Sequence, residues 1–148
     1  MVQTTRRLCA TTMAAVLLSG GILGLLFGLM DYKSWGGFFL LVLGMAFILS
    51  PLAGLHRIAV PAPPDPSLPP QRIRLYILVN IAVAILGPLM FLYIFGRVAS
   101  VYWRSFSPPI RGDWAISLQP IGLTLGAILN AAVLVYIIAS ILRSRRET

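Results

Sequence analysis

The chain is 148 residues long, and 58% of its residues are hydrophobic while only 11% are charged, which gives a mean hydropathy of +0.88. Soluble domains carry about 25% charged residues, so this composition excludes a soluble globular protein and indicates an integral membrane protein. The net charge of +8 does not indicate nucleic-acid binding, because the arginines stand at the ends of the apolar segments, where they set topology and contact anionic lipids.

Four apolar segments each exceed the roughly 18 residues that a bilayer span requires. The predicted spans are residues 8–30, 35–55, 75–95 and 115–142. Only short ends and loops remain, so residues 1–148 are expected to form a single transmembrane domain. We predict an all-α integral membrane protein whose four transmembrane helices form two hairpins joined by a proline-rich cytoplasmic loop.

The first span follows Arg6 and Arg7 and is too long for the apolar core of a cleaved signal peptide, so we interpret it as a retained helix. Gly20, Gly24 and Gly28 recur in it every four residues and should stack on one helix face. Such a glycine zipper lets the backbone of a second helix approach closely. We therefore predict a helix-packing face at these three positions.

The segment at residues 59–71 contains six prolines and separates the two halves of the chain. Proline removes a backbone donor and fixes φ, so neither a helix nor a sheet ladder is expected to run through this segment. We predict a semi-rigid, extended loop.

The third and fourth spans carry polar and helix-breaking residues at depth. Pro88 has no amide hydrogen, so the carbonyl of Ala84 needs a partner from a neighbouring helix. Gly122, Gly126 and Asn130 recur at four-residue spacing and predict another close-packing face. Counting residues from the arginines that flank these spans puts Asn130 near Pro88. We therefore predict that the third and fourth spans pack together there, with the Asn130 amide donating to the carbonyl of Ala84 or of an adjacent residue.

The longest connection outside the proline-rich loop is predicted at residues 97–114, where aromatic residues alternate with arginines. This pattern is typical of an aromatic belt in the headgroup layer, and it also suits a docking surface for the loops of a partner. The candidate interface residues are Arg97, Tyr102, Trp103, Arg104, Phe106, Arg111 and Trp114.

The basic residues also predict an orientation. With four spans both termini lie on one side, and eight of the 12 basic residues would share that side with the proline-rich loop. The positive-inside rule therefore favours a multi-pass protein of the inner (plasma) membrane with both termini in the cytoplasm.

The predicted spans contain no Asp, Glu, Lys or Arg, whereas proton-coupled carriers and pumps need ionisable groups at depth. The small multidrug transporters share the four-span plan, but their first span contains a glutamate and the first span of this chain contains no acidic residue. Cys9 is the single cysteine and excludes a thiolate metal cage. His56 is the single histidine, so it is the one candidate ligand for a haem or pigment and cannot form a histidine pair. We expect no catalytic residue, no metal and no cofactor.

These features favour a non-catalytic accessory or scaffolding subunit of a larger respiratory, photosynthetic or transport complex in the membrane. Its expected partners are the lipid bilayer and other membrane-protein subunits, not nucleic acid. An alternative is a small transporter or pore formed by self-association, with a polar path lined by Asn80, Asn130, Ser50 and Thr124. A further alternative is a redox subunit that carries a cofactor on His56.

Overall fold

The computed structural model describes residues 1–104 and 114–146, with side chains for residues 1–104 and 118–146. Its elements are α1 (Val2–Met30), α2 (Trp35–Leu52), the short 3-10 helix η1 (Leu55–Arg57), α3 (Pro70–Arg104) and α4 (Trp114–Arg146). The described residues form no strand, and the four long helices are apolar enough to cross a membrane. The predicted all-helical architecture with four candidate spans is confirmed.

Local residues explain where several helices begin and end. α2 starts directly after Ser34, whose hydroxyl oxygen accepts a hydrogen bond of 2.9 Å from the amide of Gly37. This bond satisfies an amide that has no partner within the helix. After Leu52, Gly54 adopts a left-handed φ of 77° and redirects the chain into η1. α3 begins at Pro70, where the missing amide costs no helical hydrogen bond.

Three boundaries differ from the sequence prediction. The second span ends at Leu52, and Pro70 already belongs to α3, so the proline-rich segment is shorter than residues 59–71. The predicted outer loop at residues 97–114 is helical as far as Arg104. Arginine does not end a helix at the membrane surface, because its long side chain can carry the charge out of the hydrocarbon. The first prolines after Pro88 stand only at positions 108 and 109.

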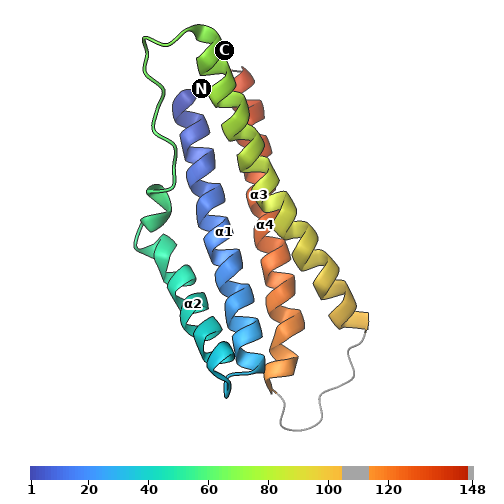
Figure 1. Cartoon of the computed structure of the whole chain (residues 1–148). Helices are drawn as coiled ribbons and strands as arrows, with labels where there is room; N and C mark the ends of the chain where they lie inside the picture. The colour runs from blue at the N-terminus through green and yellow to red at the C-terminus, as the bar shows by residue number, and fades with distance from the viewer. Residues whose placement is uncertain (105–113, 147–148) are drawn as a thin grey trace.

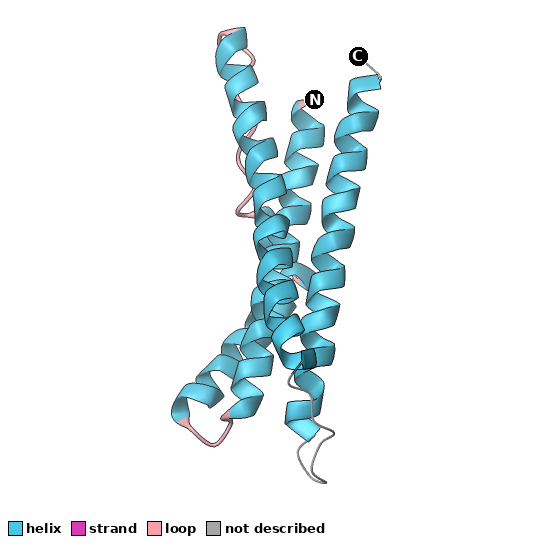
Figure 2. Cartoon of the chain, turned by 90° about the vertical axis from the view of Figure 1, so that its right-hand side faces the viewer, coloured by secondary structure: helices cyan, strands magenta, loops and turns pink. Residues whose placement is uncertain are grey.

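α1 is the central helix of the structure. It contacts α2, α3 and α4, and α3 also contacts α4, whereas α2 contacts only α1 and η1 among the described elements. Figure 1 shows both termini and the start of α3 at one end of the molecule, with the proline-rich segment running from η1 to that end. Figure 2 shows α4 beside α1 and α3, and the lower parts of α1 and α2 leaning away from α4 together.

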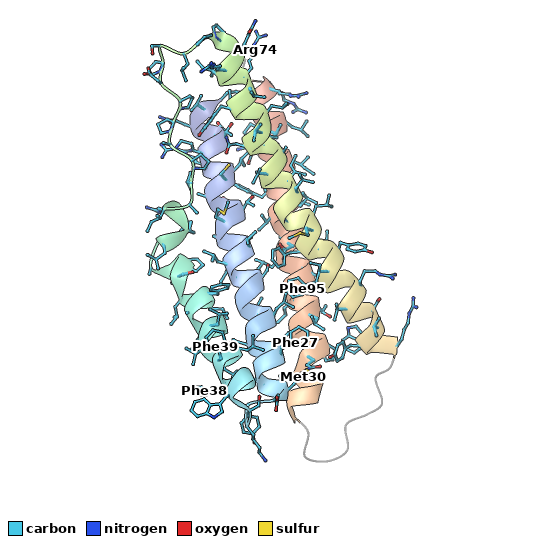
Figure 3. All side chains as sticks on the ribbon, viewed as in Figure 1. Phe27, Met30, Phe38, Phe39, Arg74 and Phe95 are labelled. Carbon is cyan, nitrogen blue, oxygen red and sulfur yellow. The ribbon has the colours of Figure 1, made fainter. Side chains whose placement is uncertain are left out.

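The apolar core lies between α1, α3 and α4. Two clusters of buried apolar side chains lie there, which are Leu8, Ala84 and Ile137, and Phe95, Ala99 and Leu123. α2 buries only Gly37 and Gly44. Its aromatic residues Phe38 and Phe39 are exposed at the end of the molecule opposite the termini (Figure 3). The fold is therefore a three-helix core with a fourth helix attached to α1.

Candidate functional site

α1 and α2 meet through glycines. A Cβ atom placed on Gly24 would lie 2.9 Å from the Cα atom of Gly44, and one placed on Gly21 would lie 2.9 Å from the Gly44 carbonyl oxygen. A Cβ atom on Gly28 would lie 2.9 Å from the carbonyl oxygen of Gly37. These separations leave no room for a side chain, so the two backbones are in direct contact. Close approach of this kind is how small residues support helix association in lipid.

Gly20 differs from the other two glycines of the predicted zipper. A Cβ atom on Gly20 would lie 3.1 Å from the ring of Phe47, which is a side chain and not backbone. The tightest backbone contacts therefore involve Gly21, Gly24 and Gly28, and Gly20 lies beside them at the edge of an open hollow. Gly21 follows Gly20 directly in the sequence and makes the closer approach to the α2 backbone.

The hollow next to Gly20 is an apolar groove of about 430 Å³ between α2 and α3, with α1 as its floor. We call it the apolar groove. Its lining residues are Gly20, Leu23, Gly24, Phe27, Leu40, Leu43, Gly44, Phe47 and Phe91. No charged side chain lines it. α3 contributes only Phe91, because α2 and α3 are not in contact.

The predicted face on α4 meets two different helices. A Cβ atom on Gly122 would lie 2.8 Å from the side chain of Leu26 in α1. A Cβ atom on Gly126 would overlap the ring of Phe95 in α3. The four-residue repeat therefore places small residues where the two neighbours of α4 come closest. Asn130 continues this face but makes a hydrogen bond instead of a backbone contact.

A hydrogen bond between α1 and α3 compensates for Pro88. The hydroxyl of Thr12 donates to the carbonyl oxygen of Ala84 at 2.9 Å, and both residues are buried. Ala84 is the residue whose carbonyl Pro88 leaves without its usual helical partner. A neighbouring helix does supply the missing donor, as expected for proline in a span. The prediction that Asn130 is this donor is wrong.

Asn130 binds α1 and lies at a different level. Its side-chain nitrogen donates to the Ser19 hydroxyl and to the Gly126 carbonyl, both at 2.8 Å, and its side chain is fully buried. Ala84 packs instead against Ile137, which is about 10 Å further along α4 than Asn130. The prediction assumed that the arginines flanking α3 and α4 lie at one level. In the structure the start of α3 extends past the end of α4 (Figure 1).

A third polar contact, between α1 and α3, lies nearer the end of the molecule that carries the termini. The thiol of Cys9 lies 3.5 Å from the side-chain oxygen of Asn80, and the Asn80 nitrogen donates to the Tyr76 carbonyl at 2.8 Å. One signal could have revealed these contacts, since the buried residues of α1 recur every three or four positions. They include Thr5, Leu8, Cys9, Thr12, Ala15 and Ser19, and the other buried residues of α1 are Gly21 and Gly28, which face α2.

The four side chains proposed to line a polar path lie in separate environments. Asn80 is buried between α1 and α3, and Asn130 between α1 and α4. Ser50 lies on α2 and donates to a carbonyl of its own helix. Thr124 also donates within its helix and accepts a hydrogen bond from the indole nitrogen of Trp103 at 3.0 Å. A single chain therefore does not align these groups along one path.

The predicted outer interface is divided by the helix boundary. Four of its residues belong to the last turns of α3, and these are Arg97, Tyr102, Trp103 and Arg104. Tyr102 packs against the cluster around Phe95, and the Trp103 indole bonds to α4. Phe106 and Arg111 lie outside the described residues. Trp114 is the first residue of α4, and its side chain also lies outside them.

His56 lies in η1 and not at the end of α2. Its Nδ1 atom is buried and has no hydrogen-bond partner among the described residues. Its neighbours in the same hollow include Arg6, Arg7 and Arg57. In the described part of the chain, no group of three or more His, Cys, Asp or Glu residues could hold a metal ion. The surroundings of His56 are therefore basic, which does not suit a cationic ligand.

No protein-family model matches the sequence, and searches against curated proteins and solved structures gave no match.

Proposed function

We propose that the protein is a non-catalytic accessory or scaffolding subunit of a larger membrane complex. In this proposal a transmembrane helix of another subunit packs into the apolar groove. The observation that carries it is the position of α2. α2 contacts a single long helix among those described, whereas α1, α3 and α4 each contact at least two. α2 and the groove beside it therefore offer an incomplete helix interface.

The shape of the apolar groove suits a helix. Lipid tails are as apolar as the groove, so helix association in a bilayer depends on close van der Waals contact. Gly20 in the floor carries no side chain, so a facing helix could come near the backbone of α1 at this position. Gly24 already faces the Gly44 backbone of α2. Phe27, Phe47 and Phe91 line the same groove and would contact the sides of that helix.

A different chain fits the apolar groove better than a second copy of this one. In a two-fold symmetric dimer whose axis passes through the groove, each groove would face the same groove of its partner. Two concave grooves facing each other would leave a space between them. A convex helix from another subunit fills the groove directly.

The polar side chains of the core support a structural role. Thr12, Ser19 and Asn130 form hydrogen bonds between helices, and they are buried. Polar groups used in this way hold helices in register.

The same proposal includes a topology. The chain would cross the inner membrane as two hairpins, α1 with α2 and α3 with α4, joined by the proline-rich loop. Arg74 lies at the end of the molecule that carries both termini (Figure 3). The excess of basic residues at this end supports its placement in the cytoplasm.

The partner is tested by site-specific photocrosslinking in intact membranes. A photoreactive phenylalanine replaces Leu43 in the apolar groove, and the matched control replaces Ile128, which is exposed on α4 and does not line the groove. We expect a covalent adduct with a different, membrane-embedded chain at position 43 and none at position 128. Native mass measurement after gentle solubilisation should show the same second chain.

An adduct with twice the mass of this chain would favour the self-associating transporter or pore. A monomer without any adduct at position 43 would contradict both proposals.

The topology is tested with an impermeant thiol reagent in intact cells carrying Cys9→Ala. We expect Lys33→Cys to be labelled and Ser67→Cys, in the proline-rich loop, to be protected until the cells are lysed. The reverse pattern would place the termini outside.

A further inference from the structure

A second hollow, distinct from the apolar groove, lies at the end of the molecule that carries the termini. It has a volume of about 730 Å³ and is formed by the first turns of α1, by η1 and by α4. We call it the basic hollow. Its basic residues are Arg6, Arg7 and Arg57, and His56 lies with them.

The basic hollow concentrates positive charge. No acidic residue of the described chain lines it. Asp31 lies in the turn before α2, at the opposite end of α1. Asp65 lies in the proline-rich segment, where its carboxylate accepts a hydrogen bond from the Ser67 amide at 2.9 Å. Three guanidinium groups around one hollow repel each other, so an anion bound among them would be stabilised. Guanidinium groups bind phosphate oxygens through paired hydrogen bonds.

Other polar groups of the basic hollow could complete such a site. Gln3 and Tyr136 also line it, and both side chains can donate hydrogen bonds. The His56 Nδ1 atom is buried and has no hydrogen-bond partner among the residues that the structure describes. A second, smaller hollow of about 220 Å³ shares Arg7 and Tyr136 and adds Arg143. The positive surface therefore continues from α1 onto α4.

The level of the basic hollow indicates where its ligand comes from. α2 is 18 residues long, about 27 Å, which is close to the thickness of the bilayer hydrocarbon. η1 follows α2 directly, so its charged residues fall at the headgroup level. The rest of the lining is Ala10, Ala14 and Val60, which are apolar, and Thr11, whose hydroxyl donates to the Arg7 carbonyl. A hollow lined by both basic and apolar residues suits a molecule that also has both characters.

From this arrangement we infer that the basic hollow is a binding site for the phosphate-bearing headgroup of an anionic glycerophospholipid. Arg6, Arg7 and Arg57 bind the headgroup phosphate, and the apolar lining contacts the first part of the acyl chains. The other basic residues at the same end, among them Arg72, Arg74 and Arg146, do not line the hollow. They provide an internal control for general attraction to an anionic membrane. The inference does not depend on the partner helix in the apolar groove.

The test uses the full chain purified in a non-ionic detergent, with phosphatidylglycerol as the probe and native mass spectrometry as the readout. We expect one phosphatidylglycerol molecule bound per chain and much weaker retention of phosphatidylcholine. One arginine near an anionic lipid surface contributes roughly a fivefold factor in affinity, so the triple variant Arg6→Gln, Arg7→Gln, Arg57→Gln should bind about 100-fold more weakly. The control triple variant Arg72→Gln, Arg74→Gln, Arg146→Gln has the same net charge and should change affinity by less than about threefold.

A substitution in the apolar lining tests the shape of the basic hollow without changing its charge. Ala14→Phe keeps every arginine but fills the basic hollow, and we expect it to weaken phosphatidylglycerol binding by at least tenfold with unchanged thermal stability. Added inorganic phosphate should not displace the lipid at millimolar concentration. Equal losses in both arginine triple variants, or full binding by Ala14→Phe, would overturn the inference. Displacement by inorganic phosphate would overturn the lipid assignment and identify a site for a soluble anion.

Discussion

α1 packs against its neighbours in two different ways on its two sides. Toward α2 it presents Gly21, Gly24 and Gly28, and the backbones touch. Toward α3 and α4 it presents Thr12 and Ser19, which form hydrogen bonds at 2.9 and 2.8 Å with those helices. Among the described residues, no side-chain hydrogen bond joins α1 to α2 at these glycines.

The difference shows how one helix can hold two kinds of neighbour in a bilayer. Without a hydrophobic driving force, helices associate through close packing or through interhelical hydrogen bonds. The α2 side depends on shape and should be sensitive to added volume. The α3 and α4 side depends on donors and acceptors, so it should be sensitive to removal of a single polar atom. Substitutions on the two sides separate these causes.

The largest effect is expected from added volume on the glycine side. Gly24→Ile should detach or displace α2, because even its Cβ atom would lie 2.9 Å from the Gly44 backbone. We expect a loss of about 1–3 kcal/mol, the usual cost of overfilling a packed contact. Thermal unfolding in detergent measures it.

The matched control is Gly96→Ile, since a Cβ atom at Gly96 meets nothing within 4 Å. Both substitutions introduce the same side chain into an apolar helix. Equal stability of the two variants would show that α1 and α2 are not in backbone contact.

A smaller effect is expected on the polar side from Thr12→Val, which keeps the shape but removes the donor to Ala84. A buried carbonyl without a partner costs about 1–2 kcal/mol. The expected loss should largely disappear when Pro88→Ala is also present, because the new amide at position 88 can bond to Ala84 within α3. Unfolding of the single and double variants gives the coupling energy.

Thr11→Val is the control, because the Thr11 hydroxyl bonds to the Arg7 carbonyl of its own helix. Additive effects of Thr12→Val and Pro88→Ala would mean that the Thr12 bond does not compensate for the proline.

The smallest effect is expected from Asn130→Leu. The substitution breaks the bond to Ser19, but it also removes the Asn130 side-chain oxygen, which is buried without a partner. Interhelical hydrogen bonds in membranes average about 0.6 kcal/mol, and the relief of the unpaired oxygen lowers the net loss further. Unfolding in detergent should show this small loss for Asn130→Leu and no additional loss when Ser19→Ala is combined with it.

Ser50→Ala is a suitable control on α2, because Ser50 bonds only within its own helix in the described structure. A loss above about 2 kcal/mol for Asn130→Leu would show a larger role for this residue than one interhelical bond.

The sequence predicted part of the candidate site. Gly24 and Gly28 were identified correctly as small residues on a face of α1, because spacing along one helix is a local property. Their partners Gly37 and Gly44 were not assigned, since the pairing of two helices depends on their relative rotation and register. The basic hollow was not predicted from the sequence for the same reason. Arg6 and Arg57 are 51 positions apart, and only the packing of η1 beside α1 brings them together.

The sequence by itself determined that the chain forms four long apolar helices, that prolines separate its halves, and that charges gather at the helix ends. These properties follow from composition and local backbone chemistry. Tertiary structure decided that Thr12 and not Asn130 serves the Ala84 carbonyl, and that α2 has one long neighbour. Both depend on how far each helix extends past its neighbours, and α3 extends beyond α4 at the terminal end (Figure 1). The sequence pattern of an apolar helix stays the same when the helix is shifted along its neighbour. The register between two helices is therefore set by the contacts between them and not by the residues of either helix alone.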